Sequence, residues 1–264
     1  MAPFLTHLVI GEQLWAGLAA RPSWAPHAGT FLFGCLAPDV DKFCDGLSQA
    51  TTHFVAKDAG YEWVNKRTRL FLDRQDEFLR APLGTLEVAE QAFVAGYLCH
   101  VATDEVTGRY GQATRRDAAG LDLPRNWVDA FLTVFDPEVW RLARDPAWIA
   151  ARLRTAAIPG GTLTFTRADC LVAMHHIVWP QVEAGGGLLA YLDMLRRHKR
   201  WQRYGQVSDE QDDVEIEARL AAYRQALEAA MPIARQLVAA IDLYEFVQQA
   251  VLRSQERVAA LLAG

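Results

Sequence analysis

The fold of this chain is decided by residues 96–105, which read GYLCHVATDE. They lie in the most apolar stretch of the sequence, 86–106, where apolar side chains would surround nearly the whole circumference of a helix. Such a helix belongs at the centre of a bundle. His100 and Asp104 are four residues apart, which places them on one helical face about 6 Å apart along the axis. An imidazole and a carboxylate so placed can reach one metal ion at about 2.0–2.2 Å, so the stretch predicts a central helix that carries part of a metal site.

The rest of the sequence is also patterned as helix. Apolar residues recur near the 3.6-residue period in 5–20, and 61–80 is amphipathic. Gly96 costs about 1 kcal/mol against alanine in a helix interior, so it predicts a close helix contact. Further helices are expected at 124–135, 137–143, 146–156, 166–179 and 188–201, and in a final region that Pro232 divides in two.

These patterns predict an all-α protein that forms a single multi-helix bundle. We find no strand alternation and no internal repeat in the sequence. Residues 1–264 are expected to form one helical domain, with a metal-ligand half at 1–110 and a helical remainder at 111–264.

Composition excludes some classes of partner. Hydrophobic residues make up 51% of the 264 residues, which is enough for a sizeable core. The net charge of −5 gives no global electrostatic reason to bind nucleic acid or an anionic membrane. No apolar run approaches the length of a transmembrane helix, and the N-terminus has no basic region followed by an apolar one. We therefore expect a cytoplasmic protein.

The four cysteines are spaced irregularly and form no C-x-x-C motif: Cys35, Cys44, Cys99 and Cys170. Reduced thiols in a cytoplasmic protein are the simplest prediction. A role for Cys44 as a metal ligand is an alternative, because it follows Asp39 and Asp41.

Three more potential metal ligands precede the central helix. His7 begins the first predicted helix, Asp39 follows a turn, and His53 lies in a polar loop. For His100 and Asp104 alone, a buried histidine paired with a carboxylate is the competing interpretation. Together with His7, Asp39 and His53 they favour a metal site. Of the neighbouring pair Asp39 and Asp41, one is expected to bind the metal, while the other supports it or pairs with Lys42.

The order and spacing of these motifs resemble the zinc-dependent phospholipase C family. The matching features are Thr-His at 6–7, Gly-x-x-x-Pro-Asp at 34–39, Thr-His-Phe at 52–54, and Gly-Tyr-x-x-His-x-x-x-Asp at 96–104. The family extends to the N-terminal domain of glycosylphosphatidylinositol-specific phospholipase D and, distantly, to fungal single-strand nucleases. The resemblance implies a helical bundle with a metal cluster in a cleft.

By motif position, the resemblance implies that Asp39, His53, His100 and Asp104 hold one metal. Asp104 would bridge to a second metal bound by His7, and Asp39 and Asp104 would be the catalytic carboxylates. The mixed nitrogen and oxygen ligands fit zinc, and manganese or iron as alternatives. Family members carry further histidines and a glutamate after the His-x-x-x-Asp motif, whereas residues 105–110 contain no histidine. We therefore expect one or two ions.

The predicted function is that of a metal-dependent hydrolase that cleaves a small-molecule or lipid phosphoester with metal-activated water. One alternative is a metalloenzyme of the same fold recruited to a biosynthetic reaction. The other is a non-catalytic bundle whose metal is structural or lost. Catalytic sites keep a ligand position open, whereas structural zinc sites are closed by four protein ligands.

Several other residues leave two interpretations open. His175 and His176 point about 100° apart on a helix, so either one faces the cleft or one is core and the other is surface. Glu105 is a base near the metal or a solvated side chain. The basic cluster 196–203 is a solvated helix end or a docking patch for phosphate or acidic lipid.

Overall fold

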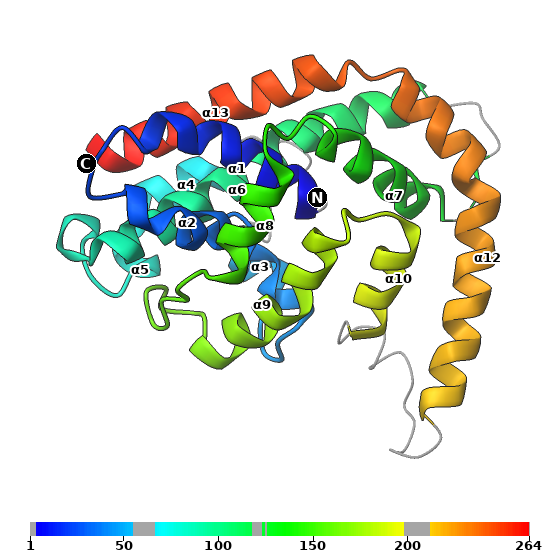
Figure 1. Cartoon of the computed structure of the whole chain (residues 1–264), viewed down its shortest axis with the longest axis horizontal. Helices are drawn as coiled ribbons and strands as arrows, with labels where there is room; N and C mark the ends of the chain where they lie inside the picture. Colours follow the sequence, from blue (N-terminus) through cyan, green and yellow to red (C-terminus); the bar gives the residue numbers. More distant parts are fainter. Residues whose placement is uncertain (1–3, 55–66, 118–122, 125, 198–211, 264) are drawn as a thin grey trace.

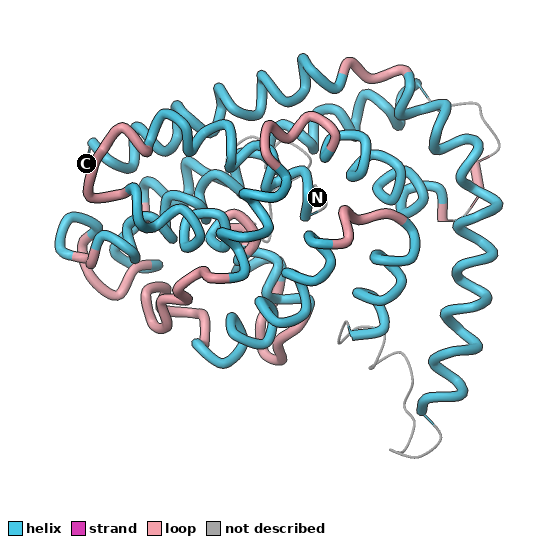
Figure 2. The backbone as a smooth tube through the Cα atoms, in the orientation of Figure 1, coloured by secondary structure: helices cyan, strands magenta, loops and turns pink. Residues whose placement is uncertain are grey.

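The computed structural model describes residues 4–54, 67–117, 123–124, 126–197 and 212–263. In this part of the chain the regular structure is helical and there is no strand, apart from an isolated bridge between Leu79 and Leu163, so the all-α prediction is confirmed (Figure 2). The α-helices are α1 (Phe4–Leu18), α2 (Ala28–Gly34), α3 (Gln49–Thr52), α4 (Arg67–Asp73), α5 (Gln75–Phe78), α6 (Val88–Asp117), α7 (Trp127–Trp140), α8 (Pro146–Arg154), α9 (Ala168–Glu183), α10 (Leu188–Arg197), α12 (Asp212–Ala239) and α13 (Leu243–Ala263). The 3₁₀ helices are η1 (Ala25–His27), η2 (Ala37–Lys42) and η4 (Leu83–Thr85).

Helix α6 is the central element, with α2 and α13 packed along it. It spans 30 residues and ends at Asp117, beyond the apolar stretch 86–106. The hydroxyl groups of Thr107 and Thr114 each donate to the carbonyl four residues earlier, and Tyr110 packs edge-on against Phe246 of α13. The tertiary contact with α13 therefore extends the helix beyond the stretch that its own apolar pattern predicts.

Two glycines let α2 and α6 cross in backbone contact. A Cβ atom added to Gly96 would lie 2.1 Å from the carbonyl oxygen of Phe31, and one added to Gly34 would lie 2.3 Å from that of Phe93. The close packing predicted from Gly96 is confirmed. The crossing also brings the C-terminal end of α2 beside His100, where the metal-ligand motifs converge.

Three prolines lie within continuous helices. Pro137 is inside α7, Pro180 is inside α9 and Pro232 is inside α12, so the helix boundaries predicted at these prolines are wrong. Helix α12 packs along α7, and this contact maintains a helix that lacks one backbone hydrogen bond. The break comes after Ala239 instead, where Asp242 Oδ1 accepts a hydrogen bond from Glu245 N and so caps α13.

The cysteine prediction is wrong for one pair. Cys44 and Cys170 form a disulfide between the segment that follows η2 and the first turn of α9, and this bond also excludes Cys44 as a metal ligand. Their sequence separation of 126 hides their proximity from any spacing rule. Cys35 and Cys99 are buried free cysteines, as expected.

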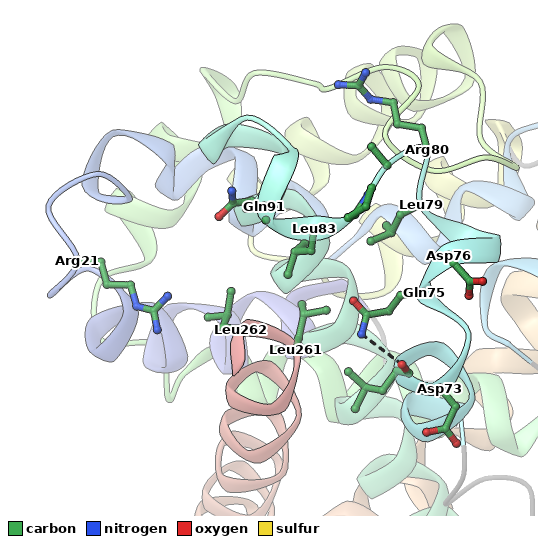
Figure 3. Close-up of a pocket in the computed structure, with 14 residues that line it drawn as sticks. Arg21, Asp73, Gln75, Asp76, Leu79, Arg80, Leu83, Gln91, Leu261 and Leu262 are labelled. Atoms are coloured by element: carbon green, nitrogen blue, oxygen red, sulfur yellow. Dashed lines mark hydrogen bonds between the residues drawn. The ribbon is translucent and has the colours of Figure 1, made fainter. Parts of the chain in front are cut away.

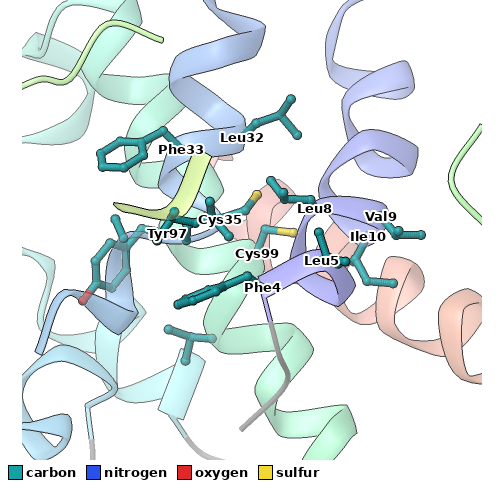
Figure 4. Packing of buried hydrophobic residues seen from close by; sticks show 14 of the residues in the cluster. Phe4, Leu5, Leu8, Val9, Ile10, Leu32, Phe33, Cys35, Tyr97 and Cys99 are labelled. Carbon is teal, nitrogen blue, oxygen red and sulfur yellow. The ribbon is translucent and has the colours of Figure 1, made fainter. Parts of the chain in front are cut away.

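The hydrophobic core lies where α1, α2 and α6 meet. Figure 4 shows Leu5 and Leu8 of α1, Leu32 of α2, and Cys99 and Tyr97 of α6 within this packed cluster. Helix α13 runs along α1 and α6, and α12 flanks α7 and α10 at one end of the molecule (Figure 1). Among the described residues, no helix combines the length and the apolar character needed to span a membrane. The division into one domain of 1–264 stays a prediction.

Candidate metal centre

The fold brings together all five side chains predicted as metal ligands. His7 comes from α1, Asp39 from η2, His53 from the C-cap of α3, and His100 and Asp104 from α6. All five are buried, with at most 2% of any residue exposed. Polar side chains that are distant in sequence thus share one small interior space.

The distances between these groups are short. His53 Nε2 lies 3.5 Å from Asp39 Oδ1 and 3.6 Å from Asp104 Oδ2. His7 Nε2 lies 3.7 Å from Asp104 Oδ1, and His100 Nε2 lies 4.0 Å from Asp104 Oδ2. The two oxygens of Asp104 therefore face different histidines, as a bridging carboxylate would require.

Backbone and hydroxyl groups orient two of the imidazoles. His100 Nδ1 lies 2.8 Å from the carbonyl oxygen of Cys35, which can only accept, so Nδ1 donates and Nε2 keeps its lone pair. His53 Nδ1 lies 2.9 Å from Thr52 Oγ1, and Tyr97 donates its hydroxyl hydrogen to the carbonyl of Thr52. The Nε2 atoms of His53 and His100 are 3.3 Å apart. Such fixing of one ring nitrogen is what orients a histidine toward a metal.

Burial and neighbouring charges together set the protonation states of the cluster. Desolvation lowers the pKa of His7 to about 4 and holds that of His100 well below its ordinary value. Burial alone would raise the pKa of Asp39, but Lys42 and His53 hold it well below its usual range. The pKa of Asp104 is likewise lowered against the effect of burial, with His100 among the nearby groups responsible. Neutral imidazoles beside ionised carboxylates are the forms that bind metals.

The donor set fits a zinc ion. Three imidazoles and two carboxylates match the ligand types zinc prefers. Asp39 Oδ2 is buried and accepts no hydrogen bond from the described residues, which leaves an acceptor for a cation. In the described part of the chain, ligand atoms lie within 4.8 Å of one another in two groups of three. These triads are His7, Asp39 and His100, and His53, His100 and Asp104.

Two cationic residues lie beside the site, and only Lys42 could be named from the sequence. Arg67 Nη1 lies 3.2 Å from Asp104 Oδ2, and Lys42 Nζ lies 2.7 Å from Asp39 Oδ1. One sequence-based alternative was that Lys42 pairs with Asp41. In the structure Lys42 pairs with Asp39 instead. The i,i+3 spacing within η2 could have indicated the Lys42 contact, but no local signal connects Arg67 to Asp104.

Asp136 on α7 positions the segment that carries His7. Its carboxylate accepts hydrogen bonds from Leu5 N at 3.2 Å and from Thr6 N and Oγ1 at 2.7 and 2.8 Å. It therefore caps the first turn of α1 from another helix, the role that an N-cap side chain usually plays locally. The sequence around His7 contains no sign of this contact.

Glu105 is buried rather than solvated. It accepts hydrogen bonds from Thr68 N and Oγ1 at 2.9 and 2.8 Å and from Arg253 Nε at 2.9 Å. It thereby ties α4 and α13 to α6. The interpretation of Glu105 as a solvated side chain is wrong, because its partners come from distant segments, and its role as a base stays a prediction.

The remaining histidines and basic residues lie outside the cluster. His175 is buried with its Nε2 2.7 Å from the carbonyl oxygen of Leu153, and His176 is exposed, so the interpretation as one core and one surface histidine is confirmed. Arg196 forms an ion pair with Glu217 of α12. The rest of the basic cluster, from residue 198 on, lies outside the described residues.

A separate groove of about 640 Å³ lies between the α5–η4 region and the C-terminal end of α13 (Figure 3). Arg21, Gln75, Arg80, Leu83 and Leu261 are among its lining residues. None of the five candidate ligands lines it.

Comparison with known proteins tests the resemblance found in the sequence motifs. Neither the curated proteins nor the solved structures contain a match to the chain. The relationships to glycosylphosphatidylinositol-specific phospholipase D and to fungal nucleases stay predictions. Residues 6–107, which include all five candidate ligands, match the family model of zinc-dependent phospholipase C, so this part of the chain carries the sequence signature of that family.

Proposed function

We propose that this protein is a metal-dependent hydrolase that cleaves a phosphoester. The observation that carries the proposal is the convergence of His7, Asp39, His53, His100 and Asp104 in one buried cluster. The match of residues 6–107 to a zinc-dependent phospholipase family supports the same reaction class. Zinc is the proposed metal, and manganese or iron fits the same ligands.

Each side chain of the cluster has a proposed role toward the metal. His53 and His100 would hold the metal through ring nitrogens, and contacts with Cys35 and Thr52 orient their rings. Asp104 directs one oxygen toward His7 and the other toward His53. A bound zinc ion would polarise a phosphoryl oxygen and lower the pKa of a water molecule.

The number of ligands in each triad favours a catalytic site over a structural one. Each triad supplies three protein ligands, whereas a closed structural zinc site has four. A small-molecule or lipid phosphoester is the proposed substrate class. The cytoplasmic location stays a prediction, and the Cys44–Cys170 disulfide is instead typical of proteins from oxidising compartments.

Elemental analysis of protein purified without chelator tests the proposal. We expect stoichiometric zinc, manganese or iron, and metal-dependent release of product from phosphomonoesters, phosphodiesters or phospholipids. The matched variants are His100→Ala, which removes a candidate ligand, and His176→Ala, which removes an exposed histidine on α9. His100→Ala should abolish hydrolysis and His176→Ala should preserve it.

The outcomes separate the alternatives. Protein that holds no metal and takes up none of the three would overturn the metalloenzyme proposal. Stoichiometric metal without hydrolysis of any phosphoester would favour a metalloenzyme with another reaction, or a structural ion.

A further inference from the structure

The two potential ligand triads share one nitrogen atom. Both contain His100. Its Nδ1 donates to the carbonyl oxygen of Cys35 at 2.8 Å, so Nε2 is the nitrogen left to bind a metal. One lone pair serves one ion at a time. The triads are therefore alternatives rather than two sites that fill together.

A fixed cation already lies against each candidate carboxylate. Lys42 Nζ is 2.7 Å from Asp39 Oδ1, and Arg67 Nη1 is 3.2 Å from Asp104 Oδ2. The side chains of Lys42 and Arg67 are only 13% and 8% exposed. Glu105, another acidic group near Arg67, is bonded to Thr68 and Arg253.

Burial makes these positive charges effective against a metal ion. Water screens them little, so each repels a cation that approaches the carboxylate it contacts. A first divalent ion must share Asp39 with Lys42 or Asp104 with Arg67. A second ion would be repelled by Lys42, by Arg67 and by the first ion. The described residues offer no further triad that could bind it.

We infer that Lys42 and Arg67 are resident cations of this centre, which compete with metal for Asp39 and Asp104 and limit the site to one metal ion. The inference rests on the proposed function and sharpens it. Only one of the two ions implied by the family resemblance would bind, and lysine and arginine would supply the remaining positive charge of the site.

Stoichiometry is the first test. The full-length protein is stripped with chelator, incubated with excess zinc sulfate, separated from free metal and assayed for zinc by mass spectrometry. One zinc per chain supports the inference, and two overturn it. No zinc overturns the proposed function instead, so the two failures are distinguishable.

The second test removes the positive charge of Lys42 and measures the Kd for zinc by calorimetric titration. Lys42→Met leaves Asp39 without its ion pair in the metal-free protein, which raises the free energy of that state and so favours zinc binding. We expect the Kd for zinc to fall about tenfold or more. The zinc-induced rise in Tm should exceed that of the wild type.

Two controls isolate the charge. Lys42→Arg keeps the positive charge and should keep the Kd near its wild-type value. Arg74→Met removes an exposed arginine that pairs with Glu77 on the molecular surface, and should also leave the Kd unchanged. An unchanged or weaker zinc affinity in Lys42→Met would overturn the competition.

Arg67→Met gives an independent measurement from another helix. It removes the cation at Asp104, and the Kd for zinc should fall in the same direction. If one of the two methionine variants does not fold, the other still decides the matter. Tighter binding supports the inference, and unchanged binding contradicts it.

Discussion

His7 and His100 stack face to face, with ring centroids 3.6 Å apart and ring planes at 8°. One ring belongs to α1 and the other to α6. Two protonated imidazoles would repel each other at this distance in a buried site. The lowered pKa of each, caused by burial, agrees with a stack of neutral rings. The contact joins the first helix of the chain to the central one at the candidate metal centre.

The histidines should differ in their effect on metal retention. His100 belongs to both triads, so His100→Ala should eliminate stoichiometric zinc. His53→Ala and His7→Ala should each retain most of the zinc, because each variant leaves the other triad complete. Zinc is measured per chain after gel filtration. Full zinc content in His100→Ala would contradict the assigned cluster.

The glycine contact between α2 and α6 predicts opposite effects for two substitutions on the same helix. In Gly96→Ala the new Cβ would meet the carbonyl oxygen of Phe31, and unfolding free energy should fall by about 3 kcal/mol. In Gly111→Ala the Cβ meets nothing within 4 Å, and stability should rise by about 0.5–1 kcal/mol. Urea denaturation measures both. Equal effects would refute the backbone contact.

The cap that Asp136 provides to α1 predicts a loss of stability and of site order. Asp136→Ala removes the acceptor for Leu5 N and Thr6 N, and should cost about 1–2 kcal/mol. Asp136→Asn keeps one acceptor oxygen and should cost less. Since His7 follows Thr6, amide hydrogen exchange in the first turn of α1 should also accelerate in Asp136→Ala. Unchanged exchange there would show that the cap does not order this turn.

The disulfide predicts a thiol count. Protein denatured without reductant should expose two reactive thiols, from Cys35 and Cys99, and four after reduction. Cys44→Ser should lower stability by about 3–5 kcal/mol, because the bond closes a long loop. Ellman titration and denaturation measure the two quantities. Four thiols without reductant would exclude the bond.

Acid should weaken the contact that Glu90 makes near the start of α6. Burial alone would raise the pKa of Glu90, but Arg80 and Thr162 lower it below the ordinary 4.5. A carboxylate with a lowered folded-state pKa contributes stability above pH 4.5, which is lost as the pH falls through the folded-state value. Since Arg80 is half exposed, water screens the ion pair and its contribution to stability is small.

Glu90→Gln should reduce stability at neutral pH and flatten its decline below pH 4.5. Denaturation curves at a series of pH values measure both effects. An unaltered pH profile in Glu90→Gln would contradict this assignment.

The sequence by itself determined the helical class, the central position of α6 and the five candidate ligands. These features are local: apolar periodicity defines a helix, and a spacing of four residues places His100 and Asp104 on one face. Gly96 also signalled close packing, because glycine is costly within a helix unless another backbone must approach it.

Only the tertiary structure decided which charges surround the ligands and which cysteines are bonded. Arg67 meets Asp104, and Cys44 meets Cys170, across loops whose closure no local pattern encodes. The same holds for Glu105 of α6, whose sequence left its role open and whose carboxylate accepts a hydrogen bond from Arg253 of α13. Helix periodicity fixes the direction of a side chain, but its partner depends on how distant helices pack.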